Sequence, residues 1–194
     1  MRRLPWPVVV LAVLAAVGPL WASPLPAAPP SSAVAALSGL DFVPARNDLD
    51  RLFQGDVAAL VGLANGTDED DPGIRLRAYR SLRHFAGDPV ATEGLRDAVA
   101  RYRGARQGTE LLYLIAALDA LGEVGDASDV DTVAPLLDAG ESRDLRAAAA
   151  RALGRLGTTT ACSRLRARSA VEPQRMVSKA IDRALQHPDC QNPG

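Results

Sequence analysis

Few residues of the chain have the types and spacing that metal binding or acid–base catalysis requires. The two histidines, His84 and His187, do not form a metal-ligand spacing with another histidine, cysteine or carboxylate pair. The acidic run at residues 68–71 suggests calcium, but at the EF-hand spacing Pro72 takes a ligand position and Tyr79 replaces the closing glutamate. We therefore expect no catalytic centre, no metal and no cofactor, and we interpret the acidic run as a solvated turn before a helix.

The first 22 residues have the organisation of a secretory signal peptide. A basic start (MRR) precedes a ten-residue apolar run at 8–17, and Gly18 and Pro19 follow it. Ten apolar residues are fewer than a membrane span needs, although an uncleaved anchor is the alternative. We expect cleavage after Ala22, a periplasmic or secreted protein, and no stable membrane anchor after cleavage.

Export changes the interpretation of the two cysteines. Cys162 and Cys190 are the only ones in the chain, and in an oxidising compartment they predict one disulfide, with two independent thiols as the alternative. Closing this loop would stabilise the fold by about 3–4 kcal/mol in the chain-entropy model. The bond would tie the C-terminal tail, residues 188–194, onto the last helices.

The rest of the chain divides into a tether and a helical repeat domain. Residues 23–45 are rich in Pro, Ala and Ser and predict a tether, with a short helical turn around residues 31–37. Residues 46–187 show helical periodicity interrupted by Gly, Pro and Asp. The chain is 47% hydrophobic but only 4% aromatic, which favours closely packed helices with many alanine contacts.

An internal repeat is the strongest pattern in this helical domain. Segments 74–82, 113–122 and 145–154 have apolar residues at their first, fifth and ninth positions, as one helix face requires, and a looser fourth copy spans 176–184 around Ala180. A shorter amphipathic helix is predicted before each copy, at residues 56–64, 89–102, 129–137 and 158–168. The repeat positions that we expect to be structural are Ala78, Leu82, Ala117, Leu121, Leu145, Ala149 and Leu153.

The sequence VAPLLD…LRAAAARALGRLG at residues 133–157 resembles a HEAT repeat, most closely the short bacterial kind related to the repeats of phycobilisome lyases. The resemblance covers roughly residues 56–186 and implies an all-α, right-handed α-solenoid of about four HEAT-like helix pairs. Arg75 and Arg146 each lie just inside a helix after an acidic turn, where we expect interhelical ion pairs and packing of their aliphatic stems. Deoxyhypusine hydroxylases, another HEAT-repeat family, bind iron through His-Glu dipeptides. Here Phe85 and Pro188 follow the histidines, so that activity is not implied.

Charge is distributed unevenly along the chain. The total is −1, which argues against a nucleic-acid partner, but residues 31–71 carry −6 and residues 141–187 carry +6. The positive end predicts a basic patch for an acidic protein, with an anionic envelope polymer, lipid head groups or a merely solvated face as alternatives. Salt-sensitive self-association, with the acidic end of one copy on the basic end of another, is a further alternative. The residues of this patch are Arg164, Arg166, Arg168, Arg175, Lys179 and Arg183.

Two functions are compatible with these patterns. The first is a non-catalytic protein–protein interaction scaffold of the bacterial envelope, which binds its partner through the second helix of each pair. The second is an enzyme accessory or maturation factor, lyase-like, with a site that the sequence does not reveal. Converging carboxylates near His84 would favour an enzyme, whereas a smooth groove would favour the scaffold.

Overall fold

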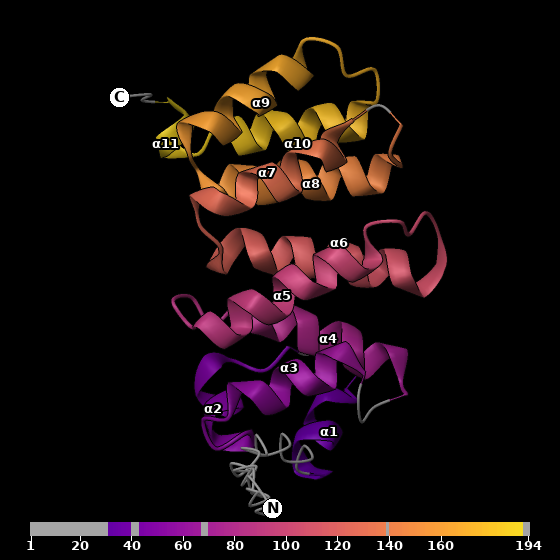
Figure 1. Cartoon of the computed structure of the whole chain (residues 1–194), viewed down its shortest axis with the longest axis vertical. Helices are drawn as coiled ribbons and strands as arrows, with labels where there is room; N and C mark the ends of the chain where they lie inside the picture. Colours follow the sequence, from indigo (N-terminus) through magenta and orange to yellow (C-terminus); the bar gives the residue numbers. More distant parts are fainter. Residues whose placement is uncertain (1–30, 40–42, 67–69, 139, 192–194) are drawn as a thin grey trace, which may run out of the picture.

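The computed structural model describes residues 31–39, 43–66, 70–138 and 140–191, and over these ranges the chain contains helices and no strands. The helices are stacked along the long axis of the molecule, from α1 at one end to α9, α10 and α11 at the other (Figure 1). The expected signal peptide and the first part of the tether, to residue 30, lie outside the described residues, as do residues 192–194 of the tail.

The elements follow one another without long connections. They are α1 (Ser31–Leu37), α2 (Arg46–Leu52), α3 (Val57–Asn65), α4 (Pro72–Leu82), α5 (Pro89–Tyr102), α6 (Gly108–Val124), η1 (Ala127–Asp129), α7 (Val130–Val133), η2 (Ala134–Leu137), α8 (Arg143–Leu156), α9 (Thr159–Ser169), α10 (Arg175–Leu185) and α11 (Pro188–Gln191). In the described part of the chain, no helix combines the length and apolar character needed to cross a membrane.

Within the described part of the chain, four helix pairs make up the stack from α3 onward. They are α3 with α4, α5 with α6, α7 and η2 with α8, and α9 with α10. The second helices pack on one another in chain order, α4 on α6, α6 on α8 and α8 on α10. This arrangement confirms the expected all-helical solenoid.

Side-chain caps fix where five of the described α-helices begin. The carboxylate of Asp88 accepts hydrogen bonds from the backbone N–H groups of Val90 (2.8 Å) and Ala91 (3.1 Å), and α5 therefore begins at Pro89, as predicted. Asp56, Asp71, Ser142 and Thr158 cap α3, α4, α8 and α9 in the same way.

The apolar stripes of the first three repeat copies are buried as predicted, but the fourth was predicted in the wrong register. The seven apolar repeat positions that we expect to be structural, from Ala78 and Leu82 in α4 to Leu153 in α8, are each fully buried. In α10, Val177 and Ile181 are buried, whereas Met176 is 45% exposed. These buried residues lie 32 positions after Leu145 and Ala149, so the last repeat keeps the 32-residue period of the one before it.

One expected helix is divided, whereas the helical turn expected around residues 31–37 is confirmed and in addition packs on the repeat domain. The helix expected at 129–137 is divided among the end of η1, α7 and η2, and Pro135, which lacks a backbone N–H, lies in the first turn of η2. Residues 31–37, inside the expected tether, form α1 and pack on α4, with Ala33 and Leu37 fully buried. The helical repeat domain therefore has an additional layer at its N-terminal end.

Glycines allow the second helices to approach one another closely. A Cβ atom on Gly122 would lie 2.7 Å from the Cα of Ala152, and one on Gly154 would lie 2.8 Å from the Cα of Ala184. Both contacts join backbone to backbone, and the second pair lies 32 residues after the first. We call the interfaces between α6 and α8 and between α8 and α10 the α6–α8 and α8–α10 seams. The two seams are therefore packed in the same register.

Candidate functional site

A groove of about 900 Å³ crosses α6, α8, α10 and the start of α11. It lies on the second helices of the pairs, and we call it the groove from here on. Its apolar lining comes from Ile115, Ala147, Gly154, Met176, Ala180, Ala184 and Pro188, and its polar lining from Asp144, Arg151, Arg155, Lys179, Arg183, Gln186 and His187.

Residues 32 positions apart occupy equivalent places on successive second helices of the groove, and we call each such series a column. One column contains Asp119, Arg151 and Arg183, and the next begins with Glu123 and Arg155. Thus α6 contributes acids to this face, whereas α8 and α10 contribute four bases and one acid, Asp144, whose Oδ1 lies 3.8 Å from Nε of Arg143.

The acids of α6 are paired with the arginines of α8. The Nη2 atom of Arg151 lies 2.7 Å from Oδ2 of Asp119, and its Nε lies 2.8 Å from Oδ1, which makes a bidentate pair. The Nε atom of Arg155 lies 2.7 Å from Oε1 of Glu123. All four side chains are about one-third or more exposed, so these pairs orient the arginines and add little stability.

The bases of α10 have no such partners. Arg175, Lys179 and Arg183 recur at i, i+4 and i+8, and none of them forms an ion pair or a side-chain hydrogen bond within the described part of the chain. On α8, the residue 32 positions before Lys179 is Ala147, which has no charge. The residue 32 positions before Arg183 is Arg151, a base that already pairs with Asp119. Lys179 and Arg183 therefore leave the groove with uncompensated positive charge.

The three arginines of α9 do not join this surface, and the expected six-residue basic patch is wrong in that respect. Arg168 binds Glu172 with its Nε 2.8 Å from Oε2, and the guanidinium of Arg166 donates to the carbonyl of Cys190. Arg164 lines a separate hollow between η2 and α9. Arg168 lines the same hollow, and Arg166, two residues from each, points in a different direction, so nearness in sequence does not bring the arginines of α9 to the groove.

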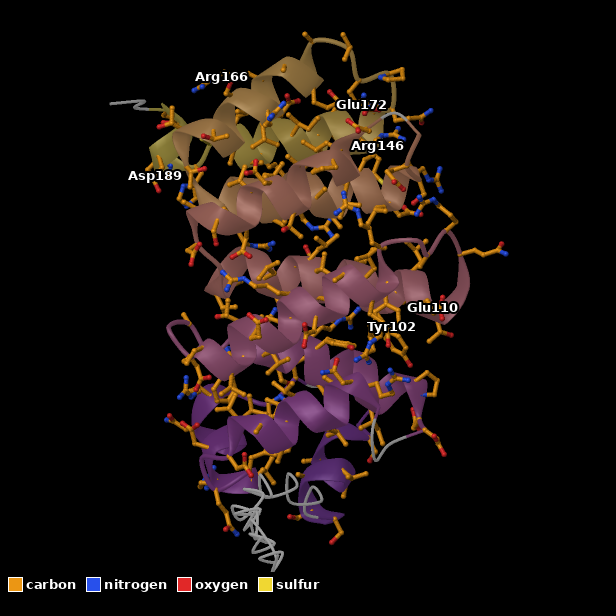
Figure 2. All side chains as sticks on the ribbon, in the orientation of Figure 1. Tyr102, Glu110, Arg146, Arg166, Glu172 and Asp189 are labelled. Atoms are coloured by element: carbon orange, nitrogen blue, oxygen red, sulfur yellow. A yellow bond between two sulfur atoms is a disulfide. The ribbon has the colours of Figure 1, made fainter. Side chains whose placement is uncertain are left out.

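Arg146 belongs to a buried charge cluster at the loop between α9 and α10 (Figure 2). Its Nε and Nη2 atoms lie 3.1 and 3.0 Å from the two carboxylate oxygens of Glu172, with side-chain exposures of 7% and 0%. Burial alone raises the pKa of Glu172, but the hydrogen bonds from Arg146, the backbone N–H of Gln174 and Arg168 outweigh it and lower that pKa to about 2. The ion pair expected for Arg146 is present.

Arg75, the equivalent residue of α4, has a different set of contacts. Its guanidinium donates to the carbonyls of Ala64 (3.3 Å) and Asn65 (3.2 Å) and to the hydroxyl of Tyr102 (2.8 Å), and it lies 4.5 Å from the ring centre of Tyr113. The cation therefore binds the carbonyl end of α3 and packs on aromatic rings.

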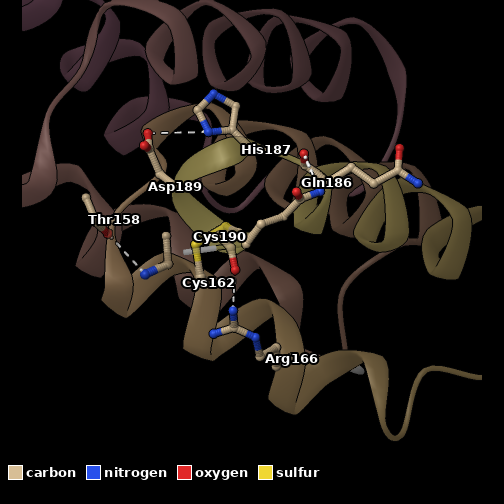
Figure 3. The surroundings of a disulfide bond; sticks show 9 residues. Thr158, Cys162, Arg166, Gln186, His187, Asp189 and Cys190 are labelled. Atoms are coloured by element: carbon tan, nitrogen blue, oxygen red, sulfur yellow. Dashed lines mark hydrogen bonds and ion pairs between the residues drawn. A yellow bond between two sulfur atoms is a disulfide. The ribbon is translucent and has the colours of Figure 1, made fainter. Parts of the chain in front are cut away.

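The disulfide between Cys162 and Cys190 has a Cα–Cα distance of 5.3 Å, and it joins α9 to α11, as expected (Figure 3). Gln186, His187 and Pro188, which precede Cys190, line the groove. The bond therefore fixes the segment that forms one end of the groove. This second role could not be predicted, because no sequence pattern indicates that the tail reaches the face of α10.

In the described part of the chain, the histidines and carboxylates form one close pair, in which Nδ1 of His187 lies 3.4 Å from Oδ2 of Asp189 (Figure 3). Among the described residues, no three His, Cys, Asp or Glu side chains are grouped so that they could hold a metal ion. His84 is not part of the groove; its carbonyl accepts a hydrogen bond from Arg46 (2.8 Å), and burial together with Arg83 and Arg46 lowers its pKa.

Comparison with known proteins agrees with this architecture. Residues 109–186 match the family model for HEAT repeats. No curated protein matches the chain. A solved structure of human deoxyhypusine hydroxylase in complex with glycerol is similar, with 23% identity and a TM-score of 0.53 over 70% of this chain and 43% of that one. At this identity the similarity concerns the fold alone, and the chain spans less than half of that enzyme.

The molecule is thus a helical-repeat solenoid with a groove across its second helices. The repeats of its C-terminal half match HEAT repeats, which supports its interpretation as a HEAT-repeat protein.

Proposed function

We propose that this chain is a non-catalytic scaffold of the bacterial envelope that binds another protein in the groove. The observation that carries the proposal is the groove itself, which has an apolar floor and unpaired cations at its edge. Stacked repeats commonly bind partners along such continuous surfaces.

The lining residues are typical of a protein interface. Met176 is a large apolar side chain that is 45% exposed, and four bases surround small apolar residues. Methionine and arginine are enriched where proteins bind one another. The groove also extends over three successive second helices, so a partner segment would contact several repeats at once.

The envelope location rests on the signal-like start of the sequence and on the disulfide. A bond between Cys162 and Cys190 is stable in an oxidising compartment and rare in the cytosol. Alkylation of the native protein under denaturing, non-reducing conditions tests this. We expect neither cysteine to react before reduction, and reaction of both would contradict the location.

Site-specific photo-crosslinking tests the binding function. A photoreactive amino acid at Met176, in the groove, is compared with one at Val90 on α5, which is 44% exposed and outside the groove. We expect the Met176 position to crosslink a defined partner in living cells and the Val90 position to give none. Equal crosslinking at both positions, or none at either, would contradict the proposed function.

A further inference from the structure

We infer that the groove recognises an acidic amphipathic helix of the partner protein, with two carboxylates one helical turn apart facing Lys179 and Arg183. This inference rests on the proposed function and names the chemistry of the partner. Three features of the molecule lead to it: the charges that remain unpaired, the way the chain pairs such charges internally, and the shape of the floor.

The first feature is the use of charge within residues 141–187. Arg146 and Arg168 are neutralised by Glu172, and Arg151 and Arg155 by the acids of α6. The bases of α10 are left without a carboxylate in the described part of the chain. Two of them, Lys179 and Arg183, line the groove and lie one helical turn apart.

The second feature is an internal example of the proposed contact. Asp119 and Glu123 lie four residues apart on α6 and hold Arg151 and Arg155, also four residues apart, on the adjacent α8. A partner helix with the same spacing of carboxylates would meet Lys179 and Arg183 in the same way. Ion pairs at this spacing fix the orientation and register of the bound helix relative to α10.

The third feature is the floor of the groove. Ala147, Gly154, Ala180 and Ala184 present little side-chain volume, and Met176 stands exposed beside them. An amphipathic helix binds such a groove by placing apolar side chains at i, i+3 and i+4 against the floor. A lipid head group or a polyanion would use the cations but has no side chain for the apolar floor.

A second copy of this chain is a poorer occupant. At the acidic end, Asp48 and Asp50 pair with arginines one turn away, and Asp56 and Asp71 cap helices. These carboxylates are already engaged in the chain that carries them. An acidic helix from another protein brings carboxylates that are free to pair.

Fluorescence anisotropy with designed peptides tests the inference on the full chain. The probe is a labelled helical peptide with leucines on one face and two glutamates four residues apart beside them; the matched peptide has glutamines instead. We expect the acidic peptide to bind and the neutral one to bind about fivefold more weakly, with a difference that shrinks in salt. The variant Lys179→Gln/Arg183→Gln should reduce the preference for the acidic peptide to near unity.

A charge-matched control separates a local effect from a general one. Arg103→Gln/Arg164→Gln removes two positive charges outside the groove and should leave the preference unchanged. Loss of preference in this control, or equal binding of both peptides to the unmodified protein, overturns the inference. Binding of anionic vesicles that also depends on Lys179 and Arg183 and exceeds peptide binding would overturn it in favour of a membrane.

The failure of this inference can be distinguished from that of the proposed function. If crosslinking at Met176 persists in Lys179→Gln/Arg183→Gln at unchanged yield, the groove binds a protein, but not through carboxylates. If crosslinking at Met176 is absent from the unmodified chain, the scaffold function itself fails.

Discussion

The α6–α8 and α8–α10 seams are packed alike but charged differently. Each has a glycine of one helix against an alanine backbone of the next, Gly122 on Ala152 and Gly154 on Ala184. On the groove side, the α6–α8 seam carries half-exposed ion pairs, whereas the α8–α10 seam carries free cations. The α8–α10 seam instead has its ion pair buried, between Arg146 and Glu172 at the loop.

This difference separates residues that maintain the stack from residues that are available for binding. The packing contacts repeat with the period of the chain, because every helix must approach its neighbour in the same way. The charges do not repeat, so they are free to differ between seams. Burial decides which charges contribute to stability, and the absence of a partner decides which can bind another molecule.

The largest expected effect comes from breaking the buried ion pair. Glu172→Gln keeps the shape of the side chain but leaves the buried guanidinium of Arg146 without a carboxylate, which should cost about 3 kcal/mol in the free energy of unfolding. Urea denaturation at neutral pH measures this. Glu123→Gln, which breaks an exposed pair, should cost less than about 1 kcal/mol. Equal losses would show that burial does not distinguish the two seams.

The same carboxylate predicts a pH dependence. The pKa of Glu172 is lowered from 4.5 to about 2 in the folded protein, so the unfolded state binds this proton more readily. The contribution of Glu172 to stability is therefore complete above about pH 4.5 and is lost as the pH falls towards 2. Unfolding free energies across this range should fall more steeply for the unmodified chain than for Glu172→Gln. Parallel curves would contradict the pKa assignment.

A moderate effect is expected from the shared glycine contacts. Gly154→Ala places a methyl group against the backbone of Ala184, and Gly122→Ala does the same at Ala152, so each should cost about 1–3 kcal/mol. Gly104→Ala, where no atom lies within 4 Å of an added Cβ, should change stability by less than about 0.5 kcal/mol. A large difference between Gly122→Ala and Gly154→Ala would show that the seams are packed differently.

Features that depend on local sequence could be predicted. The beginning of α5 follows from Asp88 and Pro89, and the buried stripe of α8 from the spacing of Leu145, Ala149 and Leu153. Such features arise within one or two helical turns. Even there, the apolar character of Met176 led to the wrong register for α10. A methionine that lines the groove is the same residue type as one in the core, so the sequence pattern does not distinguish them.

The groove depends on contacts between distant residues and could be predicted only in part. Lys179 and Arg183 were identified from their spacing, and the structure places both in the groove. The neutralisation of Arg168 by Glu172 was missed because charge counts do not show which bases find a carboxylate, although a spacing of four residues is a signal for an ion pair. The columns that join α6 to α8 and α10 require the correct 32-residue register, which becomes clear only when the buried face of α10 is known.

The smallest effect on stability should accompany a gain in binding. Asp119→Asn/Glu123→Gln frees Arg151 and Arg155. The groove side of the α6–α8 seam would then carry free cations, as the groove side of the α8–α10 seam does. Because these pairs are half-exposed, the stability loss should remain below about 1 kcal/mol for each pair. Four bases would then attract the acidic helical peptide instead of two, so its affinity should rise about threefold and its salt dependence should steepen. Anisotropy titrations at low and high salt measure both quantities. An unchanged affinity would mean that the peptide binds away from Arg151 and Arg155, and that the contrast between the seams does not control recognition.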